Sequence, residues 1–209
     1  NVSVAPMIAE VNPIEDDPEA TVRIGIVNNS EFTAKNIRII GKVAYDDNTY
    51  QIGNGSLGSK YDVHMTDDGI SYPAELDGFI TIYYSEQETP SDDLNNSANG
   101  WKTKDATNFT KVKTYMIMLN DYDMEIGKSL SFDYDIEMPM TTQNLNKVTY
   151  FTHGVYYDLV TTAGLHPSSV GGSKLGIRMS RQYDVEVTDL RAYSDRTITG
   201  TKYLLEDED

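Results

Sequence analysis

The segment from Ser129 to Met138 alternates without a break between apolar and polar side chains. Serine and carboxylate side chains fill every second position. Successive side chains of a β-strand point to opposite faces, so this period predicts a strand with one face on a core and the other in water. Pro139 ends the strand, because proline has no backbone N–H to donate to a neighbour. The predicted core face consists of Leu130, Phe132, Tyr134, Ile136 and Met138.

Shorter strand patterns, separated by turn residues, recur along the chain, and helical periodicity is weak apart from a possible short turn at 141–147. Such a pattern predicts an all-β fold, an antiparallel β-sandwich of about ten strands that is Ig-like or adhesin-like and has little helix. No Pro/Gly-rich linker interrupts it, so we expect 1–209 to be a single β-sandwich module excised from a longer surface protein. The further predicted strands are 21–27, 36–43, 78–84, 111–119, 147–159, 174–180, 183–190 and 197–205.

The chain carries a formal net charge of -16 over 209 residues. Such a surface repels phosphate backbones and anionic lipid, so we expect no nucleic-acid partner and no membrane insertion. The sequence has no cysteine, which excludes disulfides and thiol chemistry. The 15 tyrosines and 5 phenylalanines exclude a disordered acidic tail, because they supply apolar area for a core.

Motifs for catalysis are absent from the sequence. There is no G-x-S-x-G nucleophile motif and no H-E-x-x-H metal motif, and the three histidines have no ligand spacing. The run from Ser169 to Ser173, with Gly171 and Gly172, is predicted to be a loop. Acidic pairs are numerous, but a glycosidase needs two carboxylates at a fixed separation across a cleft. We therefore expect no enzyme, with a glycoside hydrolase as the least favoured reading.

One acidic turn is a candidate calcium site. Asp46, Asp47 and Asn48 offer hard oxygen ligands in a predicted loop, as calcium requires. The segment does not match the EF-hand pattern, and a solvated turn is the alternative. The sequence predicts no other cofactor.

The stretch from Ser85 to Asn108 is long, polar and rich in asparagine, aspartate and serine. Polar loops on a rigid scaffold often carry recognition, so we expect this loop to be the most mobile part and the ligand contact. The candidate ligand-binding residues are Trp101, Tyr83 and Asn99. The alternative is that Trp101 packs against the sandwich and merely ends the loop.

Several segments, in their order along the chain, carry a family resemblance. They are Asn29-Ser30 with 35–40, then 48–63, then 82–85 with Gly100-Trp101, and finally 112–113 with 126–139. In this order they resemble the β-sandwich modules of Gram-positive cell-wall-anchored (LPXTG-type) surface adhesins. Many such modules form a Lys–Asn isopeptide bond between their first and last strands. This chain departs from that layout, since no lysine precedes Lys35 and no asparagine follows Asn146.

The resemblance implies a secreted, non-catalytic module that serves as a stalk or ligand-binding unit at the cell surface. Anchoring to the cell wall would then lie in a part of the chain outside these residues. The implied partners are a host or neighbouring-cell surface protein or glycan, and neighbouring domains of the same chain. The alternative reading is a carbohydrate-binding β-sandwich module of a polysaccharide-degrading system, in which Trp101 and nearby tyrosines stack on sugar rings.

Overall fold

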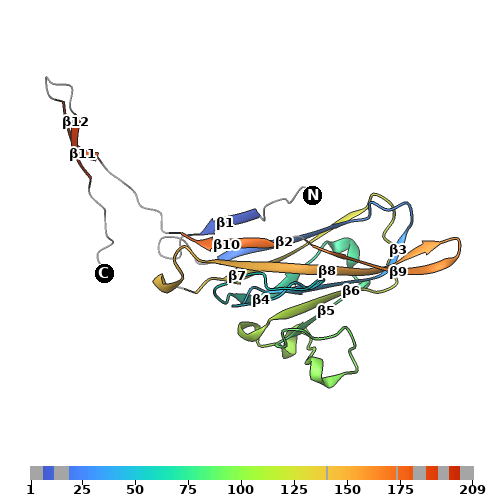
Figure 1. Ribbon diagram of the computed structural model, residues 1–209. Coiled ribbons are helices and arrows are strands. Elements are labelled where there is room, and N and C mark those ends of the chain that lie inside the picture. Colours follow the sequence, from blue (N-terminus) through green and yellow to red (C-terminus); the bar gives the residue numbers. More distant parts are fainter. Residues whose placement is uncertain are drawn as a thin grey trace.

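Two β-sheets lie face to face, with the core between them, in the computed structural model of the protein (Figure 1). The structure describes residues 7–11, 19–139, 141–172, 174–180, 187–192 and 198–202. The chain in these ranges is strand, loop and short 3-10 turns, and contains no α-helix. The prediction of an all-β sandwich is therefore confirmed.

The small sheet has three antiparallel strands in the order β2-β7-β4. Its members are β2 (Glu19–Val27), β7 (Ser129–Glu137) and β4 (His64–Ser71). The alternation predicted for β7 is confirmed, because Phe132 and Ile136 are both 0% exposed and Tyr134 is also buried. On the opposite face, Arg23 of β2 forms a two-fold hydrogen-bonded ion pair with Asp133, 2.8 and 2.7 Å long.

The large sheet has seven strands in the order β1-β10-β8-β3-β6-β5, with β9 also pairing with β8. The 14-residue strand β8 pairs with β3 along one side, and with β10 and then β9 along the other. One pairing departs from the antiparallel prediction, since β1 runs parallel to β10. The bounds are β1 Met7–Val11, β3 Ala34–Lys42, β5 Ile80–Ser85, β6 Thr114–Leu119, β8 Val148–Thr161, β9 Gly164–Gly171 and β10 Leu175–Met179.

Three strands, β1, β4 and β9, are absent from the sequence prediction. Strand β4 has a bulge between Met65 and Ile70, and the inserted residues Asp67, Asp68 and Gly69 read as a turn. The loop prediction for Ser169 and Gly171 is wrong, because both belong to β9. That strand is an edge strand with no buried residue, so its sequence lacks the alternation of apolar and polar residues by which a strand is predicted.

The chain after Met179 contributes a separate two-stranded sheet. Strand β11 (Val187–Ala192) pairs with β12 (Ile198–Lys202). The first overlaps the segment predicted at 183–190 and extends two residues beyond it, and the second lies inside the segment predicted at 197–205. The remainder of those two segments lies outside the described residues. The single-module assignment for 1–209 stays a prediction. The helical turn predicted at 141–147 is confirmed as a 3-10 turn, Thr142–Asn144.

A glycine allows the two sheets to approach at their centre. Tyr115 of β6 lies directly opposite Gly41 of β3, and its ring is 5.4 Å from the ring of Tyr134 in the facing sheet. A Cβ at Gly41 would stand 2.0 Å from the Tyr115 hydroxyl oxygen. Position 41 therefore tolerates no side chain while Tyr115 keeps its place.

Gly41→Ala is expected to lower the free energy of unfolding by about 1–3 kcal/mol or more, because the methyl group overpacks the core. Gly25→Ala on β2 is the matched control, since a Cβ there meets nothing within 4 Å. Chemical denaturation of both variants measures the difference. Equal midpoints would contradict the close packing of Tyr115 on Gly41.

Phe132→Ala is expected to lower the free energy of unfolding by roughly 3–5 kcal/mol, the cost of emptying a packed aromatic position. Asp133→Ala, one residue along on the solvent face, is expected to have a far smaller effect because its ion pair with Arg23 is in water. Arg23 lowers the pKa of the Asp133 carboxyl, mainly by hydrogen bonding, so the pair's contribution is lost as pH falls through that lowered pKa. Thermal melting of the two variants measures the contrast; a larger effect at Asp133 would shift the register of β7 by one residue.

Candidate functional site

The outer face of the large sheet, turned away from the small sheet, has no third layer of strands over it among the described residues. The strand register places five side chains side by side in one line across this face, one from each of five strands. On β3 and β6 the residues next to them in sequence, such as Ile37, Ile39 and Ile117, point into the core, so the side chains of the line point outward. We call this line the outer stripe: Thr81 of β5, Met118 of β6, Arg38 of β3, Tyr156 of β8 and Ser169 of β9.

Two loops cover the part of the outer face that adjoins this stripe. They rest on a row of buried polar side chains at the ends of β5, β6 and β3. Ser85 donates to the carbonyl of Asn99 at 2.5 Å, and Thr114 donates to the carbonyl of Gln87 at 2.8 Å. Both acceptors belong to the loop 86–101, and the other loop, 45–59, is held by Lys42. Each loop is thereby fixed along one edge of the stripe.

Lys42 is buried deeply for a lysine, with 1% of its surface exposed. Its ammonium donates to the Thr49 hydroxyl at 2.8 Å. No carboxylate in the described part of the chain lies within ion-pair distance of it. Burial lowers the pKa of the Lys42 ammonium, and the charge of Glu88 partly offsets that effect. The interaction fixes the loop 45–59 to the sheet at the cost of desolvating a charge.

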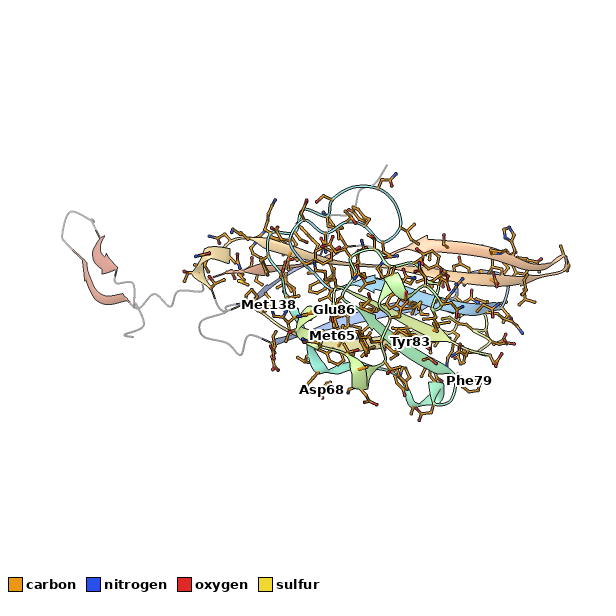
Figure 2. All side chains as sticks on the ribbon, turned by 90° about the horizontal axis from the view of Figure 1, so that it is seen from below. Met65, Asp68, Phe79, Tyr83, Glu86 and Met138 are labelled. Carbon is orange, nitrogen blue, oxygen red and sulfur yellow. The ribbon has the colours of Figure 1, made fainter. Side chains whose placement is uncertain are left out.

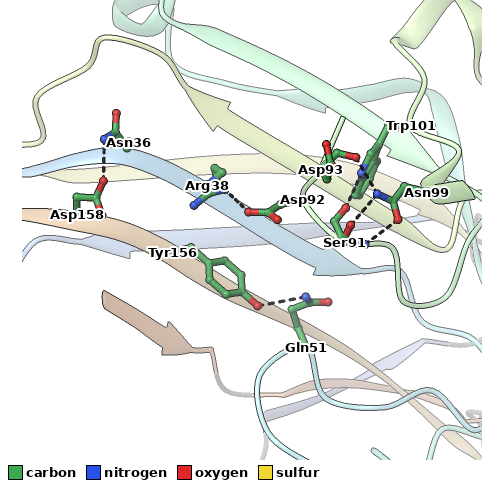
Figure 3. Close-up of polar contacts among 10 residues, drawn as sticks. All are labelled: Asn36, Arg38, Gln51, Ser91, Asp92, Asp93, Asn99, Trp101, Tyr156 and Asp158. Atoms are coloured by element: carbon green, nitrogen blue, oxygen red, sulfur yellow. Dashed lines mark hydrogen bonds and ion pairs between the residues drawn. The ribbon is translucent and has the colours of Figure 1, made fainter. Parts of the chain in front are cut away.

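Side chains from both loops contact the outer stripe (Figure 3). Asp92 from the loop 86–101 forms an ion pair with Arg38, and Gln51 from the other loop donates to the Tyr156 hydroxyl at 3.4 Å. Beyond the stripe, Asn36 donates to Asp158 at 2.7 Å. The result is a surface of aromatic, amide and charged groups whose side chains the two loops contact directly.

The loop 86–101 is held together by its own polar residues. Asn99 is only 6% exposed, and its amide nitrogen donates to the Ser91 hydroxyl and the Asp93 carbonyl, both at 2.8 Å. Its side-chain oxygen accepts from the backbone N–H of Ser91 at 2.9 Å. Trp101 adds a bond from its indole N–H to the Ser91 carbonyl, 2.8 Å long. The polar composition of this loop therefore builds an internal network of hydrogen bonds, and the mobility of the loop stays a prediction.

The three predicted ligand residues lie at one region of the molecule but differ in what they offer. Tyr83 is half-buried on β5 (Figure 2) and pairs with Met116. It stands two residues from Thr81 on the same strand, which places it on the outer face. Trp101 is half-buried at the end of the loop. The next residue, Lys102, forms a β-bridge with Tyr84 of β5, so the chain returns to the sheet at this point. Asn99 has its side-chain groups occupied within the loop, so its role there is structural. Ligand binding by Trp101 and Tyr83 stays a prediction.

Arg38 and Tyr156 complete the surface and are missing from the sequence prediction. Arg38 could have been found, because it alternates with Ile37 and Ile39 in a predicted strand. Tyr156 could not, because the apolar run Gly154–Tyr157 has no clear period. Which strands lie beside one another depends on pairing between distant segments.

The acidic turn predicted to bind calcium has most of its polar groups engaged. Asn48 is 0% exposed; its amide donates to the Tyr150 carbonyl at 2.7 Å and accepts from the Ser59 hydroxyl at 2.6 Å. Asp47 accepts from Ser56 at 2.9 Å. Asp46 and Asp47 are exposed, and no group of three or more His, Cys, Asp or Glu with metal-site geometry occurs in the described ranges. Calcium binding at this turn stays a prediction.

A groove lies at the side of the sandwich, between the end of β2 and the inner face of β8 and β9. This groove has a volume of about 610 Å³, and no aspartate, glutamate, lysine or arginine lines it. Its apolar walls include Ile26, Val27, Val155 and Val170. His153 also lines it, and burial lowers the pKa of that imidazole, so it is neutral at physiological pH.

The chain matches no protein-family model and no curated protein sequence. Among solved structures it is similar to ACE19, the collagen-binding subdomain of the Enterococcus faecalis surface protein ACE. The TM-score is 0.40 at 9% sequence identity, over 85% of this chain and 99% of that chain. A likeness of this size identifies neither a family nor a ligand, so the surface is interpreted from its own side chains. No helix in the described residues is long and apolar enough to cross a membrane.

Asn99→Ala is expected to loosen the loop 86–101, because it leaves the groups on Ser91 and Asp93 without their partner, at a cost of about 1–3 kcal/mol. Hydrogen exchange of the backbone amides in this loop measures the effect. Asn95→Ala is the control in the same loop, since Asn95 is exposed and only its backbone N–H is hydrogen-bonded. Equal exchange in both variants would show that Asn99 does not organise the loop.

Proposed function

We propose that this chain is a non-catalytic module of a bacterial cell-surface adhesin and that the outer stripe is its ligand contact. The observation that carries the proposal is the line Thr81–Met118–Arg38–Tyr156–Ser169, which lies on the outer sheet face beside two anchored loops. Half-buried Arg and Tyr side chains are the residue types that most often dominate binding energy at interfaces. A rigid sheet presents them with little loss of entropy on binding.

The composition of the surface favours binding over catalysis. An active site gathers an acid, a base or a nucleophile in a concave pocket, where burial shifts their pKa values. The outer stripe contains no aspartate, glutamate, histidine or cysteine, and its one charged group, Arg38, is already paired with Asp92. Such a surface suits an extended partner that lies across several strands, and we infer a host or neighbouring-cell surface protein.

The acidic, cysteine-free composition agrees with a secreted module at the cell surface, held in a longer chain that is anchored to the cell wall elsewhere. In this setting the sandwich serves as a stalk as well as a binding unit. Labelling of intact cells by an antibody against the module tests this location. Labelling that requires permeabilised cells would contradict it.

The double variant Arg38→Ala/Tyr156→Ala is expected to weaken binding to the partner by about tenfold or more, because it removes both anchors of the stripe. Surface plasmon resonance against a panel of extracellular-matrix proteins first identifies the partner and then measures the variant. The matched control is Arg23→Ala/Tyr72→Ala. It removes an ion-paired arginine from the solvent face of the small sheet and an exposed tyrosine just after β4.

The two double variants are compared at equal melting temperature, so that a loss of fold is not read as a loss of contact. Unchanged binding in the stripe variant, or an equal loss in the control, would contradict the proposal. The second candidate function is carbohydrate binding, which the half-buried rings of Trp101, Tyr83 and Tyr156 favour. Binding to a glycan array with no binding to matrix proteins would select it.

A further inference from the structure

The chain contains two Asn-Gly pairs, and the structure places them in opposite environments. Asn54-Gly55 lies at the tip of the loop 45–59, and Asn99-Gly100 lies inside the loop 86–101. An Asn-Gly pair can cyclise, because the glycine N–H has no neighbouring side chain to hinder its approach to the asparagine side-chain carbonyl. Whether it does so depends on the freedom of these two groups in the folded protein.

The two reacting groups of the first pair are free, although the Gly55 carbonyl accepts a hydrogen bond from the Tyr50 N–H at 3.3 Å. Asn54 and Gly55 are both exposed, and their flanking backbone is a glycine-rich turn with φ of 108° at Gly53 and 117° at Gly55. The space around Gly55 is open, since an added Cβ would meet no atom within 4 Å. In the described part of the chain neither the Asn54 side chain nor the Gly55 N–H has a hydrogen-bond partner.

The second pair is restrained at both reacting groups. The Asn99 amide is held by Ser91 and Asp93, as described above, and is almost fully buried. The nucleophile that cyclisation would need, the Gly100 N–H, donates to the Ser97 carbonyl at 3.2 Å. The same dipeptide is therefore free in one loop and fixed in the other.

We propose that Asn54 is a site of spontaneous deamidation in the folded protein and that Asn99 is protected from it. The Gly55 nitrogen loses its proton to water and attacks the side-chain carbonyl carbon of Asn54. A new C–N bond forms, ammonia leaves, and the product is a five-membered succinimide ring. Water then opens the ring at either carbonyl, giving aspartate or isoaspartate, with no oxidation or reduction at any step.

The reaction would alter the loop that borders the outer stripe. It adds a carboxylate at the tip of the turn, and isoaspartate lengthens the main chain by one methylene between Thr49 and Ser56, which are bridged. Thr49 bonds to Lys42, and Gln51 bonds to Tyr156, so both anchors of this loop lie within a few residues of the change.

Incubation of the folded module at mildly alkaline pH, followed by tryptic digestion and mass spectrometry, tests the proposal. The fragment 43–60 should gain the mass difference between a carboxyl and an amide, with isoaspartate among the products. The fragment that contains Asn99 should stay unchanged over the same time. In a urea-unfolded sample both fragments should convert, because unfolding removes the contacts that protect Asn99.

The variant Asn54→Gln assigns the change, because fragment 43–60 also contains the buried Asn48. In this variant the mass gain in that fragment should disappear while the melting temperature is unchanged. A persistent gain would place the reaction at Asn48 and overturn the assignment. Two further results would overturn the proposal: an unchanged Asn54 in the folded module when the unfolded sample converts, or conversion of Asn99 at a comparable rate in the fold.

Discussion

Tyr134 joins the two sheets at the centre of the core, and the packing of the sandwich depends on this contact. Its ring lies 5.4 Å from Tyr115 of β6 and 6.4 Å from Phe151 of β8, so one side chain of the small sheet contacts two strands of the large one. Burial raises the pKa of the Tyr134 hydroxyl well above its ordinary value, so the group stays neutral. Burying an aromatic side chain contributes about 1.5–3 kcal/mol, and here it also sets the distance between the sheets. The absence of a side chain at Gly41 is a requirement of this contact.

The commitment of one face of the large sheet to the core decides what the other face can do. The outer face has to satisfy its own polar groups, and it does so with the loops that rest on Ser85, Thr114 and Lys42. Through these bonds the loops cover one end of the face, and the side chains of Arg38 and Tyr156 in the stripe stay half-exposed. The side chains that hold the loops, at Lys42, Thr114 and Ser85, stand two rows from the stripe on the same face. The anchoring of the loops and the binding proposed for the stripe therefore draw on one sheet face.

The period of the sequence predicts most of the strands and misses others for identifiable physical reasons. Strands β2 and β7 can be predicted from the sequence because each has one solvent-exposed face and one buried face along its length. Strand β4 is hidden by its acidic bulge, and β9 by the lack of any buried residue. The outer stripe draws one residue from each of five strands, so it depends on long-range register, which no local pattern contains. Asn99 shows a further limit, because a polar residue in a polar loop has the same sequence signature whether it faces water or holds the loop together.

The parallel pairing of β1 with β10 has a mechanical consequence. Met7 lies opposite Leu175 and Val11 opposite Met179, so the chain enters the sandwich along one strand and leaves the large sheet along its parallel neighbour. Tension applied through the chain pulls the two strands past each other along their length. Their hydrogen bonds are then loaded together and do not open one after another, as they would in a peeled hairpin. Rupture under such shear is governed by the unfolding rate, and equilibrium stability does not determine it. The geometry therefore resists extension along the line on which a tethered surface protein would be stretched.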